Sequence, residues 1–296
     1  MTSSTDRHPT VVTLRTPRAA RWLGTYSALV FAFIYLPMAV IVLFSFNAGR
    51  STAKFTGFSF DWYLQAWTNS FVIESLSNSL VIATTSATLA TVFGTLAALA
   101  LQRVRGPIRS MYDTLTQVAI LIPGIVLGIA TLVFFVWSLN WINGWLNFLW
   151  PFGGEVPVLG LGLGTVIAAH TLFTMAIVIL LVRARISGMD RSLVDASADL
   201  FATPWGTFRQ VTLPHLYPAV LAAFLLSFTL SFDDFIIAFF VAGPENTLPL
   251  YIFSSIRRGV TPEINAVAST ILILTLVVLF LGQWLLRRRA NETAAP

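Results

Sequence analysis

Residues 76–101 read LSNSLVIATTSATLATVFGTLAALAL, a stretch without a charged side chain between Glu74 and Arg103. As an α-helix rising about 1.5 Å per residue, this stretch would extend for roughly 39 Å. The hydrocarbon core of a bilayer is about 30 Å thick, so an apolar stretch of this length is typical of a membrane-spanning helix. We therefore predict that residues 76–101 cross a membrane.

Five other stretches are comparably long and apolar: 25–46, 114–138, 158–182, 217–241 and 264–286. Hydrophobic residues make up 56% of the 296-residue chain and charged residues only 10%. A soluble domain carries about a quarter charged residues, which excludes a soluble globule. The predicted fold class is all-α, a polytopic membrane protein with six transmembrane helices. The first stretch is longer than the apolar core of a signal peptide, so we expect it to be retained.

The basic residues predict the orientation of these spans. Of the 18 Lys and Arg residues, 14 fall on the side of the N-terminus and four on the other side, namely Arg50, Lys54, Arg257 and Arg258. Because basic residues concentrate on the cytoplasmic side, both termini are expected inside. The expected organisation is a cytoplasmic tail (1–24), a six-helix membrane domain (25–287) and a second tail (288–296). The net charge of +5 then follows from topology and does not indicate a nucleic-acid partner.

Motifs for catalysis or nucleotide binding are missing from the sequence. It contains no HExxH, GxSxG or GxxxxGK[ST] pattern, and the GLGLG run from Gly160 lacks the third glycine of a dinucleotide loop. The three histidines, His8, His170 and His215, do not have the spacing of metal ligands, and the chain has no cysteine. We predict neither a catalytic residue nor a metal site nor a cofactor on this chain. His170, within the fourth span, is interpreted mainly as a satisfied polar residue of the helix interior.

The internal loop 183–216 is predicted to contain two short helices. Ser192 and Asp195 have the spacing of a capping box, which favours a helix from Leu193 to Ala202. Thr203 is expected to cap a second helix with Pro204 at its first position. One side of the first helix is apolar, and a cytoplasmic loop cannot bury such a face in lipid. We infer that this face packs against protein.

The stretch 195–214, DASADLFATPWGTFRQVTLP, resembles the EAA loop of binding-protein-dependent ABC importer permeases. The loop residues that carry the likeness, and that the family uses to couple to its ATPase, are Asp195, Ala196, Ser197, Phe201, Ala202, Leu213 and Pro214. Phe201 stands where the family has glycine. The resemblance implies an inner-membrane permease of the type I importer fold, a paralogous permease partner, a separate ATPase dimer that holds ATP and Mg, and a soluble substrate-binding protein.

The stretch 226–266, LSFTLSFDDFIIAFFVAGPENTLPLYIFSSIRRGVTPEINA, is similar to the spermidine/putrescine subgroup of these permeases, in particular to the smaller of its two membrane subunits. The likeness covers most of residues 25–287. It implies ATP-driven uptake of polyamines, with permeases for other small organic cations or solutes as the alternative. Putrescine and spermidine are not distinguished.

Two adjacent carboxylates, Asp233 and Asp234, lie within the fifth predicted span between Phe232 and Phe235. An unpaired carboxylate in contact with lipid is costly, so at least one should face a water-filled pathway or a partner charge. A diamine or triamine has the complementary charge and an apolar stem suited to phenylalanine rings. The four residues are therefore predicted to line the substrate pathway. Capping of a neighbouring helix, or pairing with a basic group on a second membrane subunit, remains the alternative role of the carboxylates.

Two other functions remain as rivals to the importer. A self-sufficient secondary transporter would transport by itself and show inverted repeats, which the sequence does not display. A membrane-embedded hydrolase would need a nucleophile with a nearby base, and no serine motif accompanies His170.

Overall fold

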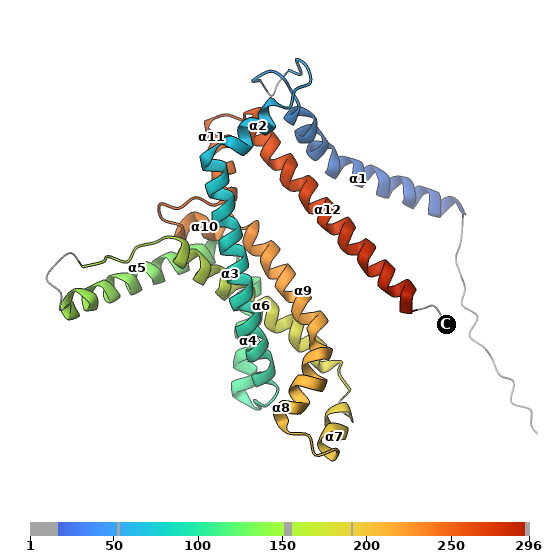
Figure 1. Cartoon of the computed structure of the whole chain (residues 1–296), viewed down its shortest axis with the longest axis vertical. Coiled ribbons are helices and arrows are strands. Elements are labelled where there is room, and N and C mark those ends of the chain that lie inside the picture. Colours follow the sequence, from blue (N-terminus) through green and yellow to red (C-terminus); the bar gives the residue numbers. More distant parts are fainter. Residues whose placement is uncertain (1–16, 52–53, 151–155, 191, 294–296) are drawn as a thin grey trace, which may run out of the picture. The chain divides into compact units, whose positions relative to one another are not determined.

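The structure is a computed structural model that describes residues 17–51, 54–150, 156–190 and 192–293 (Figure 1). The regular structure of these residues is helical, with one isolated antiparallel bridge between Asn47 and Phe58. The elements are α1 (Pro17–Ser45), α2 (Asp61–Thr68), α3 (Ser70–Leu101), α4 (Pro107–Leu121), α5 (Gly124–Leu149), α6 (Leu163–Ser187), α7 (Ser192–Asp199), α8 (Pro204–Thr207), the π-helix η1 (Phe208–Thr212), α9 (Leu213–Phe232), α10 (Ile236–Val241), α11 (Leu248–Arg258) and α12 (Pro262–Thr293). The prediction of an all-α fold is confirmed.

Five helical segments of the described residues are long and apolar enough to cross a membrane: Trp22–Ser45, Ser70–Leu101, Gly124–Leu149, Leu163–Ser187 and Pro204–Phe232. The sixth predicted stretch, 264–286, lies in α12, whose described apolar section Pro262–Val277 is shorter than these five. The prediction of a polytopic membrane protein is therefore confirmed.

The prediction of one helix over 114–138 is wrong. Helix α4 ends at Leu121, and Ile122 adopts an extended conformation with φ −64° and ψ 130°. Pro123 then precedes the first residue of α5. Proline disfavours the helical conformation of the residue before it and lacks an N–H group, so the chain breaks here instead of bending. The apolar span is α5, which begins ten residues later than predicted.

The prediction of one helix over 217–241 is wrong as well. Helix α9 ends at Phe232 and α10 begins at Ile236, so Asp233 and Asp234 lie in the break between two helices and not inside one. The side chain of Asp234 accepts hydrogen bonds from the first backbone amides of α10, which stabilises a new helix start at this point.

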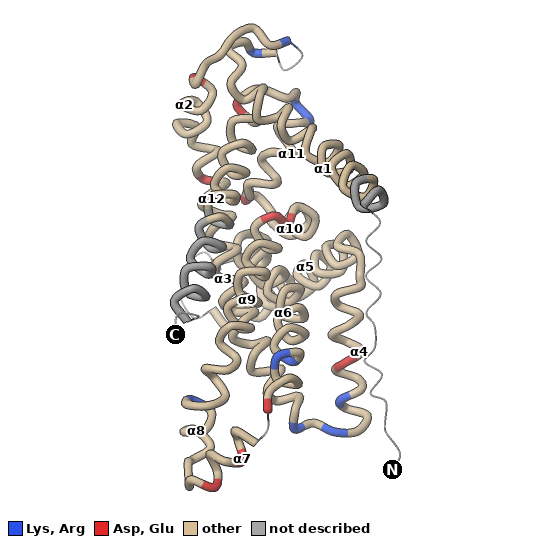
Figure 2. Tube along the Cα trace, turned by 90° about the vertical axis from the view of Figure 1, so that its right-hand side faces the viewer, with Lys and Arg blue, Asp and Glu red and all other residues tan. Residues whose placement is uncertain are grey.

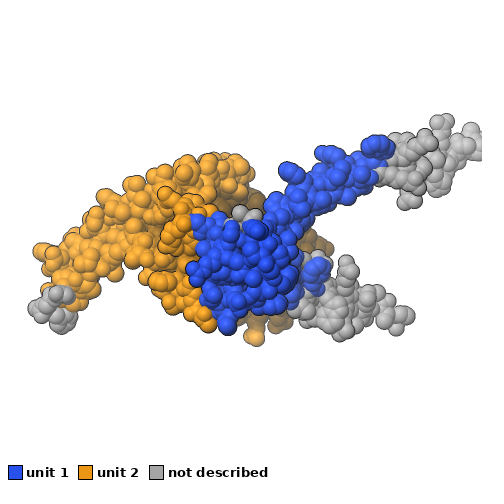
Figure 3. Space-filling model, turned by 90° about the horizontal axis from the view of Figure 1, so that it is seen from above, with its two compact units in different colours: residues 1–66, 259–296 blue, residues 67–258 orange. Residues whose placement is uncertain are grey.

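The chain divides into two compact units, shown in different colours in Figure 3: residues 1–66 with 259–296, and residues 67–258. In the first unit, α1 packs against α12. The loop after α1 is organised by Asn47, whose buried side chain donates to the carbonyl oxygens of Ser51 and Lys54 and accepts from the amide of Thr56. These bonds satisfy loop backbone that forms no regular structure.

The core of the second unit is built by α3, α6 and α9, which are packed side by side. A glycine sets the closest approach of α3 to α6, because a Cβ at Gly94 would lie 2.8 Å from Cβ of Val178. Small residues allow helix backbones to approach in this way in membranes. Buried Ala90, Ala98 and Ala223 extend the same close packing.

Helix α10 packs against α5 and α6. Its buried Ile237 and Val241 pack with Ile82 of α3 and Val166 of α6. This packing fixes α10, and with it the position of the break that holds the two carboxylates.

Candidate functional site

The predicted loop helices are present with different bounds. Helix α7 runs from Ser192 to Asp199, whereas the prediction was 193–202. The predicted capping box of Ser192 and Asp195 is wrong, because Ser192 is itself helical and its amide donates to Oδ1 of Asp190 over 2.9 Å. Hydrogen bonds from the amide and hydroxyl of Ser192 hold the pKa of Asp190 below its usual range. Asp190 thus takes the capping role that the sequence pattern suggested for Ser192.

Helix α7 ends early because the chain turns into the left-handed region at Phe201, which has φ +57°. The amide of Ala202 donates a hydrogen bond to the carbonyl oxygen of Ser197 over 3.1 Å. The amide of Phe201 donates one to the carbonyl oxygen of Ala198 over 2.9 Å. This pair of bonds is a Schellman motif, whose left-handed position is normally glycine. The backbone conformation at position 201 is therefore one that favours glycine, whereas this chain has phenylalanine.

Helix α8 begins as predicted, with Oγ1 of Thr203 accepting from the amide of Gly206 over 3.1 Å and Pro204 in the first turn. The hydroxyls of Ser197 and Thr207 are 2.9 Å apart and tie α7 to α8. Leu213 and Pro214 are the first residues of α9. Residues 192–232 therefore form one chain of helices from α7 to the end of α9.

The loop helices expose apolar side chains, as expected for a face that packs against another protein. Phe201 is 96% exposed, Leu200 81% and Trp205 69%. Of the other predicted coupling residues, Ser197 is half-buried and the rest are exposed: Asp195, Ala196, Ala202, Leu213 and Pro214. The ring of Trp205 is stacked on that of Phe208 at 5.4 Å, but all three side chains remain largely uncovered by the described part of this chain.

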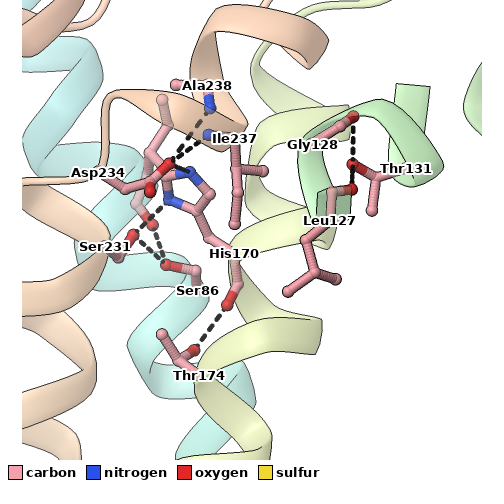
Figure 4. Close-up of polar contacts among 11 residues, drawn as sticks. Ser86, Leu127, Gly128, Thr131, His170, Thr174, Ser231, Asp234, Ile237 and Ala238 are labelled. Carbon is pink, nitrogen blue, oxygen red and sulfur yellow. Dashed lines mark hydrogen bonds and ion pairs between the residues drawn. The ribbon is translucent and has the colours of Figure 1, made fainter. Parts of the chain in front are cut away.

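The two carboxylates of the break face different surroundings. Asp233 is exposed, and its amide donates to the carbonyl of Thr229, the last turn of α9. Asp234 is 18% exposed and points toward α10 and α6 (Figure 4). Its Oδ2 accepts from the amides of Ile237 over 2.9 Å and Ala238 over 3.2 Å.

A series of buried polar side chains extends from Asp234 into the helix core (Figure 4). Nε2 of His170 lies 3.2 Å from Oδ2 of Asp234, a close contact without the geometry of a hydrogen bond. Nδ1 of His170 is 2.8 Å from Oγ of Ser231, which is 2.8 Å from Oγ of Ser86. The hydroxyl of Ser86 in turn lies 2.7 Å from the carbonyl oxygen of Ile82. Through these contacts α3, α6 and α9 share one polar cluster directly below the carboxylates.

The two predicted phenylalanines are half-buried and take part in separate aromatic contacts. The ring of Phe235 is 4.5 Å from that of Phe253 in α11, and the ring of Phe232 is stacked on Phe228 at 6.0 Å. They flank the break from its two sides. The sequence interpretation treated His170 as a structural residue but missed Ser231 and Ser86. No local sequence pattern relates Ser231 or Ser86 to His170, because the three residues come from α9, α3 and α6 and meet only in the folded chain.

These features define a class of protein: a polytopic membrane protein whose broken span carries acidic residues and whose internal loop presents an uncovered apolar helix pair. The chain matches the family model described as "Binding-protein-dependent transport system inner membrane component" over residues 90–290. It belongs to this family, and it is a multi-pass permease subunit of the inner membrane and not a catalytic one.

Relatives cover almost the whole chain. The putrescine transport system permease protein PotI of Escherichia coli (strain K12) is 36% identical over 274 residues, 92% of each chain. The spermidine/putrescine transport system permease protein PotC of the same strain is 33% identical over 271 residues, 90% of this chain and 95% of the relative. PotC of Haemophilus influenzae is 33% identical over 266 residues, 90% of this chain and 96% of the relative.

Solved structures share the fold. A crystal structure of a bacterial ABC transporter that imports the acidic polysaccharide alginate has a TM-score of 0.69 at 16% identity, covering 91% of this chain and 95% of that chain. The inward-facing MetNI methionine ABC transporter has a TM-score of 0.52 at 18% identity, covering 78% and 99%. The predicted importer permease fold is thus confirmed.

Proposed function

We propose that this chain is a permease subunit of an ATP-driven importer for polyamines, putrescine or spermidine. The observation that carries the proposal is the identity of 36% and 33% to permeases named for these substrates, over 92% and 90% of the chain. The carboxylate pair in the broken span supports it, because a polyamine is a flexible cation. An anionic solute would be repelled by the same pair.

In this proposal the membrane domain is 25–287, flanked by the tails 1–24 and 288–296, with six crossings and both termini in the cytoplasm. The distribution of Lys and Arg supports this orientation. Helix α12 would supply the sixth crossing. The loop helices α7 and α8 then lie on the cytoplasmic side, and the connection between α10 and α11 lies outside.

We assign the substrate contact to Asp233 and a supporting role to Asp234. Asp233 is exposed and has no ion-pair partner among the described residues, so its carboxylate is available to an ammonium group. Asp234 is occupied by two backbone amides and the imidazole of His170. Phe232 and Phe235 border the carboxylates and would pack against the methylene stem of the polyamine.

The exposed side chains of α7 and α8 form the surface that seats on the separate ATPase. That subunit would hold ATP and Mg, because the sequence carries no phosphate-binding loop. A paralogous permease completes the pathway, and a soluble binding protein delivers the substrate from outside. Closure of the ATPase dimer would move the helices from α7 to α9 as a rigid body and open the pathway alternately to each side.

Uptake of a labelled diamine into proteoliposomes that hold the complete complex tests the substrate assignment. Asp233→Asn should lower uptake by about tenfold or more, since a charge-assisted contact is lost, and leave thermal stability unchanged. Asp233→Glu keeps the charge and should retain most of the uptake. Asp234→Asn should lower both uptake and thermal stability, because its carboxylate supports α10.

Uptake at the wild-type rate in Asp233→Asn would overturn the assignment. Uptake of an uncharged solute at the same rate as the diamine would refute the polyamine proposal and leave the permease class intact.

A further inference from the structure

A cavity of about 720 Å³ opens in the second unit beside the ends of α3 and α6. Its charged lining residues are Arg103, Arg105, Arg109, Asp113, Arg183 and Asp195. Figure 2 shows basic residues of this unit at the end where α4 begins and α6 ends. The volume is that of a small-molecule site, and four arginines against two aspartates give the cavity an excess of positive charge.

Part of this charge is neutralised within the cavity. Nη1 of Arg183 is in direct contact with Oδ1 of Asp113, and Nε of Arg109 lies 3.8 Å from Oδ2 of the same carboxylate. The Arg183 guanidinium holds the pKa of Asp113 below its usual range, so this aspartate is ionised at neutral pH. Asp113 therefore counts as the partner of Arg183 and, more weakly, of Arg109.

Arg103 and Arg105 have no such partner. Both are exposed, and neither guanidinium forms an ion pair or a hydrogen bond with the part of the chain that the structure describes. They precede α4, whose first turn contains Arg109 and no acidic residue. Since a helix start favours negative charge, this segment gathers positive charge, and the Asp195 carboxylate that lines the same cavity forms no ion pair with it among the described residues.

The position of the cavity favours a lipid over a soluble anion. It lies beside Leu101 and Ser187, the last residues of two candidate spans, where hydrocarbon gives way to headgroups. Leu180, deeper along α6 than Arg183, also lines the cavity and is 52% exposed, which offers an apolar contact next to the charges. The side of α4 away from the cavity exposes Ile108, Leu115 and other apolar side chains, as a helix in contact with lipid does.

We propose that this cavity binds the phosphate group of an anionic phospholipid, phosphatidylglycerol, through Arg103 and Arg105. The phosphate oxygens pair with the two guanidinium groups, and the start of an acyl chain lies against Leu180. Basic pockets between transmembrane helices take lipid headgroups in this way. The site is separate from the substrate pathway, and the proposal does not depend on which solute is transported.

Native mass spectrometry of the purified full chain, with phosphatidylglycerol or phosphatidylcholine added to the detergent, tests the proposal. The wild type should retain one phosphatidylglycerol per chain in preference to phosphatidylcholine. Arg103→Gln with Arg105→Gln should weaken this binding by about tenfold or more, because each arginine near a membrane surface contributes to anionic lipid binding. The matched control is Arg257→Gln with Arg258→Gln, an exposed arginine pair of the same unit outside the cavity.

Arg103→Lys with Arg105→Lys keeps the charge and should retain the lipid, which separates electrostatic binding from a folding defect. Equal binding of phosphatidylglycerol to the wild type and the glutamine variant would overturn the proposal. Displacement of phosphatidylglycerol from the wild type by millimolar inorganic phosphate would also overturn the proposal, since the cavity would then be a general anion site. An equal loss in both arginine-pair variants would also overturn it, because the effect would then come from net charge alone.

Discussion

At the scale of single residues, Phe201 has both an unfavourable backbone conformation and an unfavourably exposed side chain. A side chain with Cβ is strained at φ +57°, and a ring that is 96% exposed leaves its apolar surface in water. Neither feature is compensated within the described part of this chain. An outlier of this kind supports a role in binding another protein, and under the proposed function the exposed ring would contact the ATPase.

Phe201→Gly should relieve the strain and stabilise the end of α7 by about 1 kcal/mol. Hydrogen exchange of the amides at 201 and 202, followed by mass spectrometry, should slow by about fivefold. Phe201→Ala removes the ring but keeps the strain, so its exchange should match the wild type. Both variants should weaken association with the ATPase in copurification. Equal exchange in the glycine and alanine variants would show that the backbone conformation carries no strain.

At the scale of helices, the second unit depends on the close approach of α3 and α6. Gly94→Ala would place a methyl group 2.8 Å from Val178 and 3.2 Å from the carbonyl oxygen of Met175. We expect this overpacking to destabilise the chain by roughly 1–3 kcal/mol, measured as a lower midpoint of thermal unfolding in detergent.

The matched control for this substitution is Gly144→Ala in α5, where an added Cβ meets nothing within 4 Å. That change should leave the midpoint unchanged or raise it slightly, because alanine favours helix more than glycine does. A lower midpoint in the control alone would contradict the packing argument.

Hydropathy predicted which stretches enter the membrane but not where their helices break. Average hydropathy over a stretch of sequence does not show that Pro123 disfavours the helical conformation at Ile122. The effect of proline on the preceding residue would by itself have predicted that helix boundary. The break at Asp233 depends on Asp234 accepting two amides of α10, a choice between local structures that composition does not reveal. The contact of His170 with Ser231 joins residues 61 positions apart, beyond any local pattern.

At the scale of the whole molecule, topology is open to a direct experiment because the chain contains no cysteine. Single cysteines at Lys54 and Ala202, both exposed, should react with a membrane-impermeant maleimide from opposite sides of sealed vesicles. The proposed orientation expects Lys54→Cys to be labelled from outside intact cells and Ala202→Cys only after lysis. Labelling of both positions in intact cells would refute six crossings with both termini inside.

The break after α9 also gives the two neighbouring carboxylates different anchors. Asp233 is bonded to the last turn of α9, whereas Asp234 is held by α10 and by His170 of α6. Helical turns follow one another from Pro204 to Phe232, so in the proposed mechanism a displacement of α8 would be transmitted along α9 to Asp233. Such a displacement would separate Asp233, which moves with α9, from Asp234, which stays with α10, and would thereby weaken the negative potential around the bound cation.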